Sequence, residues 1–422
     1  MCNLTRYKFK NICLDKGFIR GPFGSALKKS LFVPKSEDTY KVYEQCVPLE
    51  QDKSKGNYYI TGDYFRKSLS RFEVKHNDFL VSCSGVNYGA IYHLKEPFEQ
   101  GVINQALLII RVNDKIVDYN YFKYLFKIVL SRAITTGTGD STIPNFPSID
   151  VIKDIDVYLP TIDVQQKIGA ILNCIDEKII NNIHVSDYLQ HMAKTLYDYW
   201  FVQFDFPDEN GKPYRTSGGA MKWNEQLKRE IPKEWGVGNL YNIADFINGL
   251  ACQKFRPKDG ENALPVIKIK EMHDGITAET EQVSENIPTK HKIYDGDILF
   301  SWSATLEVMY WYGGIGGLNQ HIFKVNPKSY FPKEYVYEQL SSYIVNFVKL
   351  AEARKTTMGH ITTDHLEQGK IPLPPESLLN QFTEKIRPIH QKIGQTKQEN
   401  CVLTKLRDWL LPMLMNGQAR VE

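Results

Sequence analysis

The feature that most constrains this chain is an internal repeat, because a duplicated sequence predicts a duplicated fold. Asp78-Phe-Leu-Val-Ser-Cys-Ser84 resembles Asp297-Ile-Leu-Phe-Ser-Trp-Ser303, and Ile103-Asn-Gln105 resembles Leu318-Asn-Gln320. The matching segments occur in the same order in both halves, and each Asn-Gln pair leads into an apolar run. We therefore interpret the chain as two copies of one unit.

Each copy ends in a long segment with helical periodicity. Val157-Tyr-Leu-Pro160 matches Ile371-Pro-Leu-Pro374, and from there the copies align without a gap. Apolar residues recur at spacings of four and three at equivalent positions: Ile168, Leu172, Ile175 and Ile179 in the first copy, and Phe382, Ile386, Ile389 and Ile393 in the second. This spacing predicts a long helix with a heptad seam in each copy.

Polar residues interrupt the seam near the middle of both helices. Asn182 and Ser186 correspond to Thr396 and Asn400. Buried polar seam residues cost stability but fix register and partner, so we expect these four residues to set the register. Two equal helices with a domain between them in sequence pair most simply as an intramolecular antiparallel coiled coil, and we predict that arrangement. The alternative is that each helix packs as an ordinary core helix with a solvated middle turn. Pro388 predicts a kink in the second helix, or a helix start near residue 388.

The part of each copy before its long helix reads as mixed α and β structure. Apolar runs bounded by Asp, Asn and Gly predict strands at 79–83, 106–112, 298–302 and 321–325. Shorter helices are expected over Tyr119–Ile134 and Lys333–Arg354. The predicted fold class is thus α+β, with two tandem α+β domains separated by two long helices that form an antiparallel coiled coil. The expected segments are a first domain at 1–160, a first long helix at 161–206, a linker at 207–231, a second domain at 232–375, and a second long helix with a C-terminal tail at 376–422.

Composition excludes several classes of protein. Hydrophobic residues make up 42% and charged residues 24% of the chain, which is typical of a soluble, well-cored protein. We expect no membrane span, because no run approaches the roughly 18 apolar residues that one needs. Seven scattered cysteines without a CxxC pair argue against a disulfide framework or a zinc site and favour the cytoplasm. A formal net charge of +3 is too small to hold a polyanion by itself, so such a ligand would require local basic loops or a cationic partner.

No catalytic or metal-binding motif emerges from the sequence. Neither a GxxxxGK[ST] phosphate loop nor a GxGxxG motif after a strand occurs, and there is no Asn-Pro-Pro-aromatic motif of adenine methyltransferases. His360 and His365 are five residues apart, so they would not share a helix face as metal ligands. We expect neither catalytic residues nor a metal site in this chain.

These features resemble those of the specificity subunits of type I restriction–modification systems, over nearly the whole chain. The resemblance rests on the repeat, on Gln165-Gln-Lys-Ile-Gly-Ala-Ile-Leu172 at the start of the first long helix, and on Leu196-Tyr-Asp-Tyr-Trp200-Phe-Val-Gln-Phe204-Asp-Phe206 at its end. Ile231-Pro-Lys-Glu-Trp235, before the second copy, is also similar to the family. The departures are a degenerate start of the second helix, at 379–386, and Pro388 within it.

The resemblance implies a non-catalytic subunit that reads DNA. Its two α+β domains would be target recognition domains, each reading half of a bipartite duplex sequence across a gap set by the coiled coil. The implied partners are double-stranded DNA, two methyltransferase subunits and restriction subunits. S-adenosylmethionine, ATP and Mg would be bound by those partner subunits and not by this chain. Two alternatives are a duplicated coiled-coil protein–protein scaffold that does not bind nucleic acid, and a self-sufficient methyltransferase, which the missing motifs disfavour.

Candidate DNA contacts are polar and cationic residues in loops that could enter a groove. In the first copy they are Lys28, Lys29, Ser82, Ser84, Asn87, Tyr88, Thr136, Thr138, Ser141 and Thr142. In the second copy they are Gln253, Lys254, Arg256, Ser301, Trp302, Ser303, Lys355, Thr356, Thr357 and His360. The alternative for each is an ordinary solvated loop. The aromatic residues around Trp200, and their near counterpart Trp409, would pack against a recognition domain or dock a methyltransferase subunit.

Overall fold

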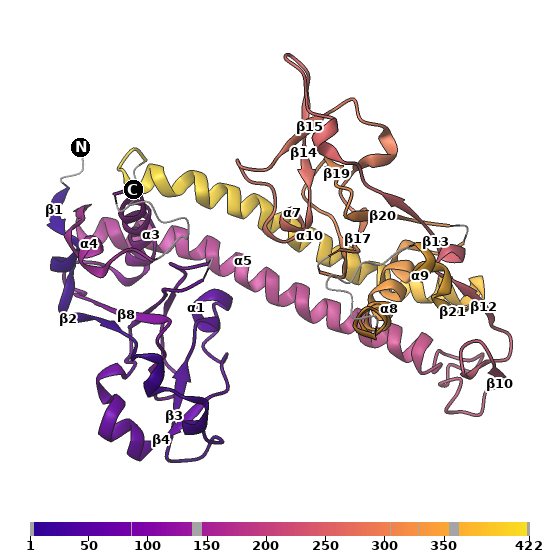
Figure 1. Cartoon of the computed structure of the whole chain (residues 1–422), viewed down its shortest axis with the longest axis horizontal. Coiled ribbons are helices and arrows are strands. Elements are labelled where there is room, and N and C mark those ends of the chain that lie inside the picture. Colours follow the sequence, from indigo (N-terminus) through magenta and orange to yellow (C-terminus); the bar gives the residue numbers. More distant parts are fainter. Residues whose placement is uncertain are drawn as a thin grey trace. The chain divides into compact units, whose positions relative to one another are not determined.

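The computed structural model describes residues 4–85, 87–136, 146–303, 305–328, 330–353 and 363–419. The chain forms two compact units, which are drawn in Figure 1. The first unit comprises Met1–Glu177 with Lys405–Glu422, and the second comprises Lys178–Thr404. Each unit therefore contains the front part of one copy together with pieces of both long helices. The segment boundaries expected from the sequence remain predictions.

The first unit contains three small sheets. Its four-stranded antiparallel sheet has the order β2-β8-β5-β6, and a three-stranded sheet has the order β4-β3-β7, with β3 parallel to β7. A two-stranded antiparallel sheet joins β1 to β9. The bounds are β1 Thr5–Lys8, β2 Cys13–Arg20, β3 Thr39–Tyr43, β4 Tyr59–Thr61, β5 Phe79–Ser82, β6 Ile91–His93, β7 Gly101–Ile103, β8 Leu107–Val112 and β9 Asp156–Leu159.

The second unit repeats this topology strand for strand. Its antiparallel sheet β13-β20-β17-β18 matches β2-β8-β5-β6, and β15-β14-β19 matches β4-β3-β7, again with one antiparallel and one parallel pairing. The pair β12-β21 matches β1-β9, and a short strand, β16, is added beside β19. The bounds are β12 Gly236–Asn239, β13 Ala244–Asn248, β14 Ala263–Ile267, β15 Gln282–Ser284, β16 Lys292–Ile293, β17 Ile298–Ser301, β18 Glu307–Tyr310, β19 Gly316–Leu318, β20 Ile322–Pro327 and β21 Lys370–Leu373. The predicted duplication is confirmed.

The central strands are apolar runs because both of their faces are covered. In β5, Phe79 and Val81 pack in one core with Phe122 of helix α3 (Tyr119–Thr136), whereas Leu80 packs in another core with Ile103 of β7. In the second unit, residues of β17 likewise divide between a core with helix α8 (Lys333–Ala353) and a core with β19. Burial on both faces replaces the alternation of a half-exposed strand with a continuous apolar run. Two short helices, α4 (Ile149–Asp154) and α9 (Thr363–Gln368), follow α3 and α8.

The two long helices are present and pair antiparallel. Helix α5 spans Ile162–Tyr197 and continues into a π-helical turn at Asp198–Val202, and α10 spans Glu376–Met415. In the second unit, the Asn182 side-chain amide donates to Glu399 Oε2 over 2.8 Å and to Asn400 Oδ1 over 2.9 Å. Ser186 Oγ lies 2.9 Å from Thr396 Oγ1. Because a step forward along α5 is a step backward along α10, the pairing is antiparallel, as predicted.

The seam pairs are also symmetric with respect to the repeat. In the alignment of the two copies, Asn182 is equivalent to Thr396, and Ser186 is equivalent to Asn400. In the structure the contacts are crossed, because Asn182 contacts Asn400 and Ser186 contacts Thr396. This cross-pairing is what a two-fold relation between these two helix segments requires. That these four residues set the register remains a prediction.

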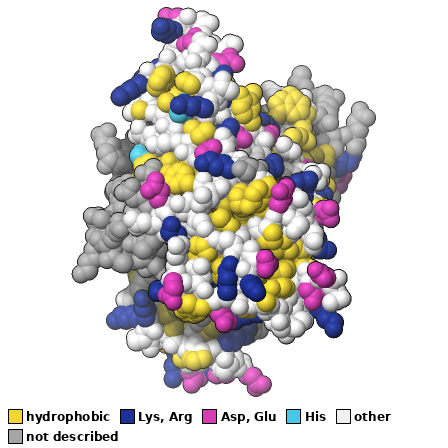
Figure 2. All heavy atoms as spheres, turned by 90° about the vertical axis from the view of Figure 1, so that its right-hand side faces the viewer, with side chains coloured by type: hydrophobic (Ala, Val, Ile, Leu, Met, Phe, Trp, Pro, Cys, Tyr) yellow, Lys and Arg dark blue, Asp and Glu magenta, His cyan; other side chains and the backbone are white. Residues whose placement is uncertain are grey.

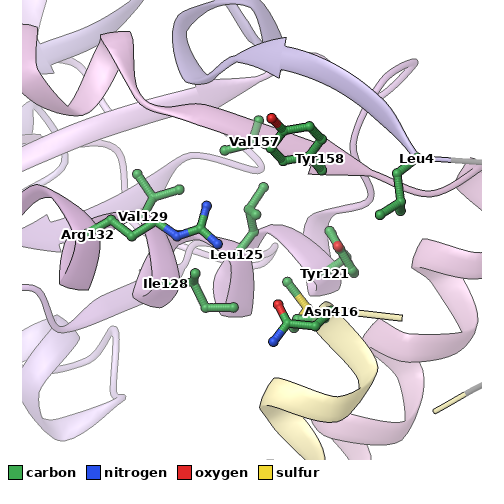
Figure 3. A pocket seen from close by; sticks show the side chains of 10 residues that line it. Leu4, Tyr121, Leu125, Ile128, Val129, Arg132, Val157, Tyr158 and Asn416 are labelled. Carbon is green, nitrogen blue, oxygen red and sulfur yellow. The ribbon is translucent and has the colours of Figure 1, made fainter. Parts of the chain in front are cut away.

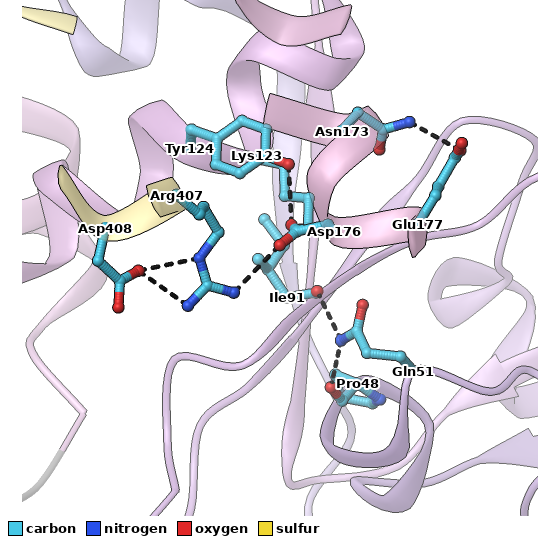
Figure 4. A network of polar contacts seen from close by, with 10 residues as sticks. All are labelled: Pro48, Gln51, Ile91, Lys123, Tyr124, Asn173, Asp176, Glu177, Arg407 and Asp408. Atoms are coloured by element: carbon cyan, nitrogen blue, oxygen red, sulfur yellow. Dashed lines mark hydrogen bonds and ion pairs between the residues drawn. The ribbon is translucent and has the colours of Figure 1, made fainter. Parts of the chain in front are cut away.

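In the first unit, the two long helices meet around a buried carboxylate, Asp176 (Figure 4). Its oxygens accept from Lys123 Nζ over 2.7 Å and from the Tyr124 hydroxyl over 2.8 Å, both on α3. They also accept from an Arg407 guanidinium nitrogen over 3.1 Å, and Arg407 pairs in turn with Asp408. Burial alone would raise the pKa of Asp176, but its cationic and hydroxyl partners lower the pKa below the ordinary value.

One expectation about the second long helix is corrected, and the predicted linker contains regular structure. A helix start near Pro388 is wrong, because α10 begins at Glu376 and continues through Pro388, held by buried Phe382 and Ile386 on one side of the proline and Ile393 on the other. The predicted linker at 207–231 contains strand β10 (Met221–Asn224), which forms a hairpin with β11 (Arg229–Pro232). Among the described residues, no helix is long and apolar enough to span a membrane.

Candidate DNA-binding loops

Three loops of the first unit lie together at one end of its four-stranded sheet, where the strands run into their connections. Strands β2 and β5 end there, and β8 and β6 begin there, because neighbouring strands are antiparallel. The Gly21 N–H donates to the Leu107 carbonyl over 2.9 Å, and the Cys83 N–H donates to the Ala106 carbonyl over 2.8 Å. We call these three loops the first loop edge: 21–29, 104–106, and the described residues 83–85 and 87–90 of the connection between β5 and β6.

The second unit has an equivalent edge, where β13 and β17 end and β20 and β18 begin. The Gly249 N–H donates to the Ile322 carbonyl over 3.1 Å, and the Trp302 N–H donates to the His321 carbonyl over 3.4 Å. We call the loops at 249–256, 302–303, 305–306 and 319–321 the second loop edge. The same hydrogen bonds thus bring the same loops together in both copies.

A glycine anchors each loop edge by close backbone contact. A Cβ atom on Gly21 would lie 1.8 Å from the Asn104 carbonyl oxygen, and one on Gly249 would lie 2.0 Å from the Asn319 carbonyl oxygen. No other residue can occupy either position without moving the backbone. The glycines therefore fix how the first loop of each edge passes over the Asn-Gln turn.

The Asn-Gln turn is held by its asparagine and presents its glutamine. Asn104 Oδ1 accepts from the Ala106 N–H over 3.0 Å, and Asn319 Oδ1 accepts from the His321 N–H over 3.2 Å. Gln105 is exposed and Gln320 is half-buried. A glutamine amide offers both a donor and an acceptor to base edges in a DNA groove. Sequence reasoning missed both glutamines as site residues, although the repeated Asn-Gln pair was the available signal.

The structure separates the candidates of the first copy. Lys28, Lys29, Ser84 and Asn87 are exposed, and Tyr88 is half-buried. Ser82 is the last residue of β5 and is fully buried, so its side chain cannot reach a groove in this conformation. Thr136 ends α3, and Thr138, Ser141 and Thr142 lie outside the described residues. Gln45, which had not been singled out, donates a hydrogen bond to the Ser84 carbonyl and so supports that loop.

The second copy divides in a similar way. Gln253, Lys254 and Arg256 are exposed, and Trp302 is half-buried with its ring 5.7 Å from that of His321. Ser301 and Ser303 are buried, and the Ser301 hydroxyl donates to the Ser303 carbonyl over 3.3 Å. Both serine side chains are therefore shielded from solvent. Lys355, Thr356, Thr357 and His360 lie outside the described residues.

The charges of the molecule are local and mixed. On the face drawn in Figure 2, acidic and basic side chains are interspersed, in keeping with the small net charge. At the first loop edge, burial raises the pKa of the Cys83 thiol to about 12, although nearby Arg20 acts in the opposite sense. Cys83 is therefore a neutral thiol at physiological pH and not a nucleophile. In the described ranges, no group of three or more His, Cys, Asp or Glu side chains could hold a metal ion.

A cavity of about 150 Å³ lies in the first unit between α3, the β1-β9 pair and the end of α10 (Figure 3). Leu125, Ile128 and Val129 of α3 line it, and Arg132 is its one charged lining residue. This volume is below the roughly 300–1,000 Å³ of ordinary small-molecule sites. This cavity brings together no acid, base and nucleophile among its lining residues.

The fold and the paired loop edges define a duplicated recognition protein, and comparisons with known proteins identify its family. The model of the type I restriction modification DNA specificity domain matches residues 39–186 and 232–403. The chain therefore belongs to the family of type I restriction–modification specificity subunits. It is a non-catalytic subunit concerned with recognition of DNA sequence.

Individual relatives agree with this assignment. The chain is 26% identical over 381 residues to the type I restriction enzyme MjaIX specificity subunit of Methanocaldococcus jannaschii, covering 87% of this chain and 83% of the relative. It is 23% identical over 402 residues to the HindI specificity subunit of Haemophilus influenzae, covering 82% and 87%. The crystal structure of a type I restriction–modification S subunit from M. genitalium aligns with a TM-score of 0.56 at 16% identity, over 98% of this chain and 96% of that one. At that identity, the structural match supports the fold alone.

Proposed function

We propose that this chain reads a bipartite DNA duplex target, with one half-site for each loop edge, and recruits methyltransferase and restriction subunits to it. The observation that carries the proposal is the repetition of one loop edge, with the same glycine contact and the same Asn-Gln turn. Two copies of a reading edge, linked by paired helices, suit a target of two short sequences separated by an unread gap. In this proposal, 1–160 and 232–375 are the target recognition domains.

Each loop edge offers the chemistry that groove recognition needs. Amide and hydroxyl groups read base edges, and lysine and arginine contact phosphates. The first edge carries Gln105, Asn87 and Ser84 together with Lys28 and Lys29. The exposed residues of the second edge include Gln253, Lys254 and Arg256. We retain as candidate DNA contacts these exposed residues, the half-buried Tyr88 and Trp302, and the predicted contacts that lie outside the described residues.

Exposed apolar side chains on the long helices support docking of two copies of one partner. On α5, Tyr188 and Met192 are 73% and 57% exposed, and on α10 the equivalent Val402 and Leu406 are 66% and 41% exposed. Residues four apart share a helix face, so each helix carries an apolar stripe at the same position of the repeat. Trp409, one turn further along α10, is 60% exposed. Two methyltransferase subunits would each cover one stripe.

The sequence predicts two roles for these aromatic residues, packing against a recognition domain and docking of a methyltransferase subunit. We assign the two roles to different residues. Trp200 and Phe201 are each 2% exposed and pack in the core of the second unit with Phe382. They serve packing. Trp409, in contrast, remains available to a partner.

The proposal assigns the chemistry to the partners. Methyltransferase subunits would bind S-adenosylmethionine and methylate adenine, and restriction subunits would use ATP and Mg to translocate and cut DNA. The assembly would act in the cytoplasm. The alternative function, a scaffold that does not bind nucleic acid, explains the helix stripes but leaves the repeated polar loop edges without a role.

The test is methylation-sensitive single-molecule sequencing of the host genome, with the gene present, deleted and restored. Loss of N6-methyladenine at one bipartite motif on deletion, and its return on restoration, is the expected result. Restoration with Gln105→Ala or Gln320→Ala provides matched variants, because each should relax the motif only in its own half. An unchanged methylome, or methylation of a single uninterrupted motif, would contradict the proposal.

A further inference from the structure

Phe23, at the tip of the first loop edge, is 90% exposed, a larger exposed fraction than that of any other large hydrophobic side chain among the described residues. Leaving a phenylalanine in water forgoes the free energy that its burial would provide. Single exposed apolar residues are common on protein surfaces and often have no functional role. The surroundings of Phe23 distinguish it from such cases.

The backbone on both sides of Phe23 is tied down. The preceding Pro22 is buried, and before it Gly21 lies against the Asn104 carbonyl. After it, the Phe23 carbonyl accepts from the Ala26 N–H over 2.8 Å, and the Ala26 carbonyl accepts from the Tyr64 hydroxyl over 2.9 Å. The ring is therefore held out from an anchored turn.

Polar and cationic groups surround this turn. A Cβ on Gly24 would lie 2.6 Å from Gln105 Oε1, so the glutamine proposed to read bases lies directly beside it. Lys28 and Lys29 are exposed a few residues further along the loop. Cations and a base-reading amide beside an exposed ring match a polyanion with stackable bases better than they match an apolar protein surface.

We propose that Phe23 inserts its ring between neighbouring base pairs of the first half-site and opens that step. This inference rests on the proposed function, because it requires the first loop edge to lie in a DNA groove. Apolar wedges of this kind unstack a base step and bend the duplex. The methylation assigned to the partner requires its target base outside the helix, and a step already opened lowers the cost of extruding it.

The second loop edge lacks an equivalent wedge. Counting from the anchoring glycines Gly21 and Gly249, the position of Phe23 is occupied by Ala251. Phe255, four residues later, corresponds to Leu27 and is 39% exposed. The wedge therefore acts in one half-site only, which makes its effect distinguishable from a general loss of DNA binding.

The test uses the full chain and duplexes that carry the motif found by genome methylation sequencing, with single 2-aminopurine substitutions along both half-sites. This base analogue becomes more fluorescent when it is unstacked. At saturating chain concentration, one step in the first half-site should brighten with the wild-type chain and with Phe23→Trp, but not with Phe23→Ala. Affinity should fall about tenfold in Phe23→Ala, as expected for loss of one stacked aromatic.

Leu14→Ala is the matched control. Leu14 is 49% exposed and lies on the same strand, β2, near the end opposite the loop edge. It should change neither fluorescence nor affinity. If the wild-type chain binds the duplex but no step brightens, or if Phe23→Ala brightens as the wild type does, the wedge is refuted while the proposed function stands. If the wild-type chain fails to distinguish the motif from other DNA, the proposed function itself fails.

Discussion

The two loop edges share a frame and differ at their tips. In both units, at the end of the sheet opposite the loop edge, an aspartate before the central strand pairs with a cation on the neighbouring strand: Asp78 with Arg111 at 2.7 Å, and Asp297 with Lys324 at 2.7 Å. The glycine contact and the Asn-Gln turn are also repeated. The tips, in contrast, carry different residues. These repeated contacts fix where the loops leave the sheet, while the exposed loop residues are free to differ. Reading two different half-sites would require this freedom.

A second difference between the copies lies where the long helix meets the shorter one. In the first copy, Asp176 of α5 contacts Tyr124, whereas at the equivalent place in the second copy His390 of α10 lies 3.0 Å from Glu338. The carboxylate lies on the long helix in the first copy and on the shorter helix in the second. In the first copy, Arg407 of the other long helix also contacts this carboxylate.

The largest effect is expected from Arg407→Ala. Arg407 is 22% exposed and Asp176 is 8% exposed, so the substitution leaves a buried carboxylate with fewer partners and should cost about 3 kcal/mol. Lys178→Ala is the matched control between the same two helices: Lys178 pairs with Glu399 at 3.4 Å, and the two side chains are 47% and 44% exposed, so its loss should cost less than about 1 kcal/mol. Thermal unfolding of the full chain measures both. Equal losses would mean that the two contacts do not differ.

Acid should act on the same carboxylate. Because the folded state lowers the pKa of Asp176, the carboxylate stabilises the fold above its unfolded pKa, and this contribution is lost as the pH falls through the folded pKa. Asp176→Asn should therefore be less stable than the wild type at pH 7, and the difference should shrink as the pH falls below about 4. Urea unfolding at a series of pH values tests this. A difference that stays constant with pH would contradict the assigned shift.

Substitution of the anchoring glycines tests whether the two loop edges act independently of each other. Gly21→Ala should displace the first loop edge, and Gly249→Ala the second, each at a cost of about 1–3 kcal/mol for the forced backbone movement. In genome methylation sequencing, each variant should weaken or relax only its own half of the motif. Gly211→Ala is a control for the loss of a glycine, since nothing lies within 4 Å of its Cβ position, although its positive φ of 72° adds a small local strain. Relaxation of both halves by one variant would show that the copies are coupled.

Much of the fold could be predicted from the sequence, because the repeat and the apolar periodicity are carried by buried residues. Strands, both long helices and their antiparallel pairing followed from these patterns. The candidate site could be predicted only as a set of loops. Ser82 and Ser301 fall in both a predicted strand, 79–83 or 298–302, and a candidate loop, and the structure places each as the buried last residue of its strand. The exposure of Phe23 depends on contacts with Asn104 and Tyr64, which are distant in the sequence and leave no local signal.

The smallest effect on stability is expected at the seam, where one residue from each copy meets the other. Ser186 and Thr396 satisfy one another, and the Thr396 hydroxyl also lies 2.8 Å from the Ile393 carbonyl. Replacing both, as Ser186→Ala with Thr396→Val, removes donor and acceptor together and should change stability by less than about 1 kcal/mol. Its consequence should instead be on register, because an apolar seam no longer penalises a shifted pairing. The expected result is a methylome with motifs of more than one gap length. This would show that the polar pairs, and not the total stability of the coil, hold the two copies at a fixed spacing. One unchanged gap length would assign that role to Asn182 and Asn400.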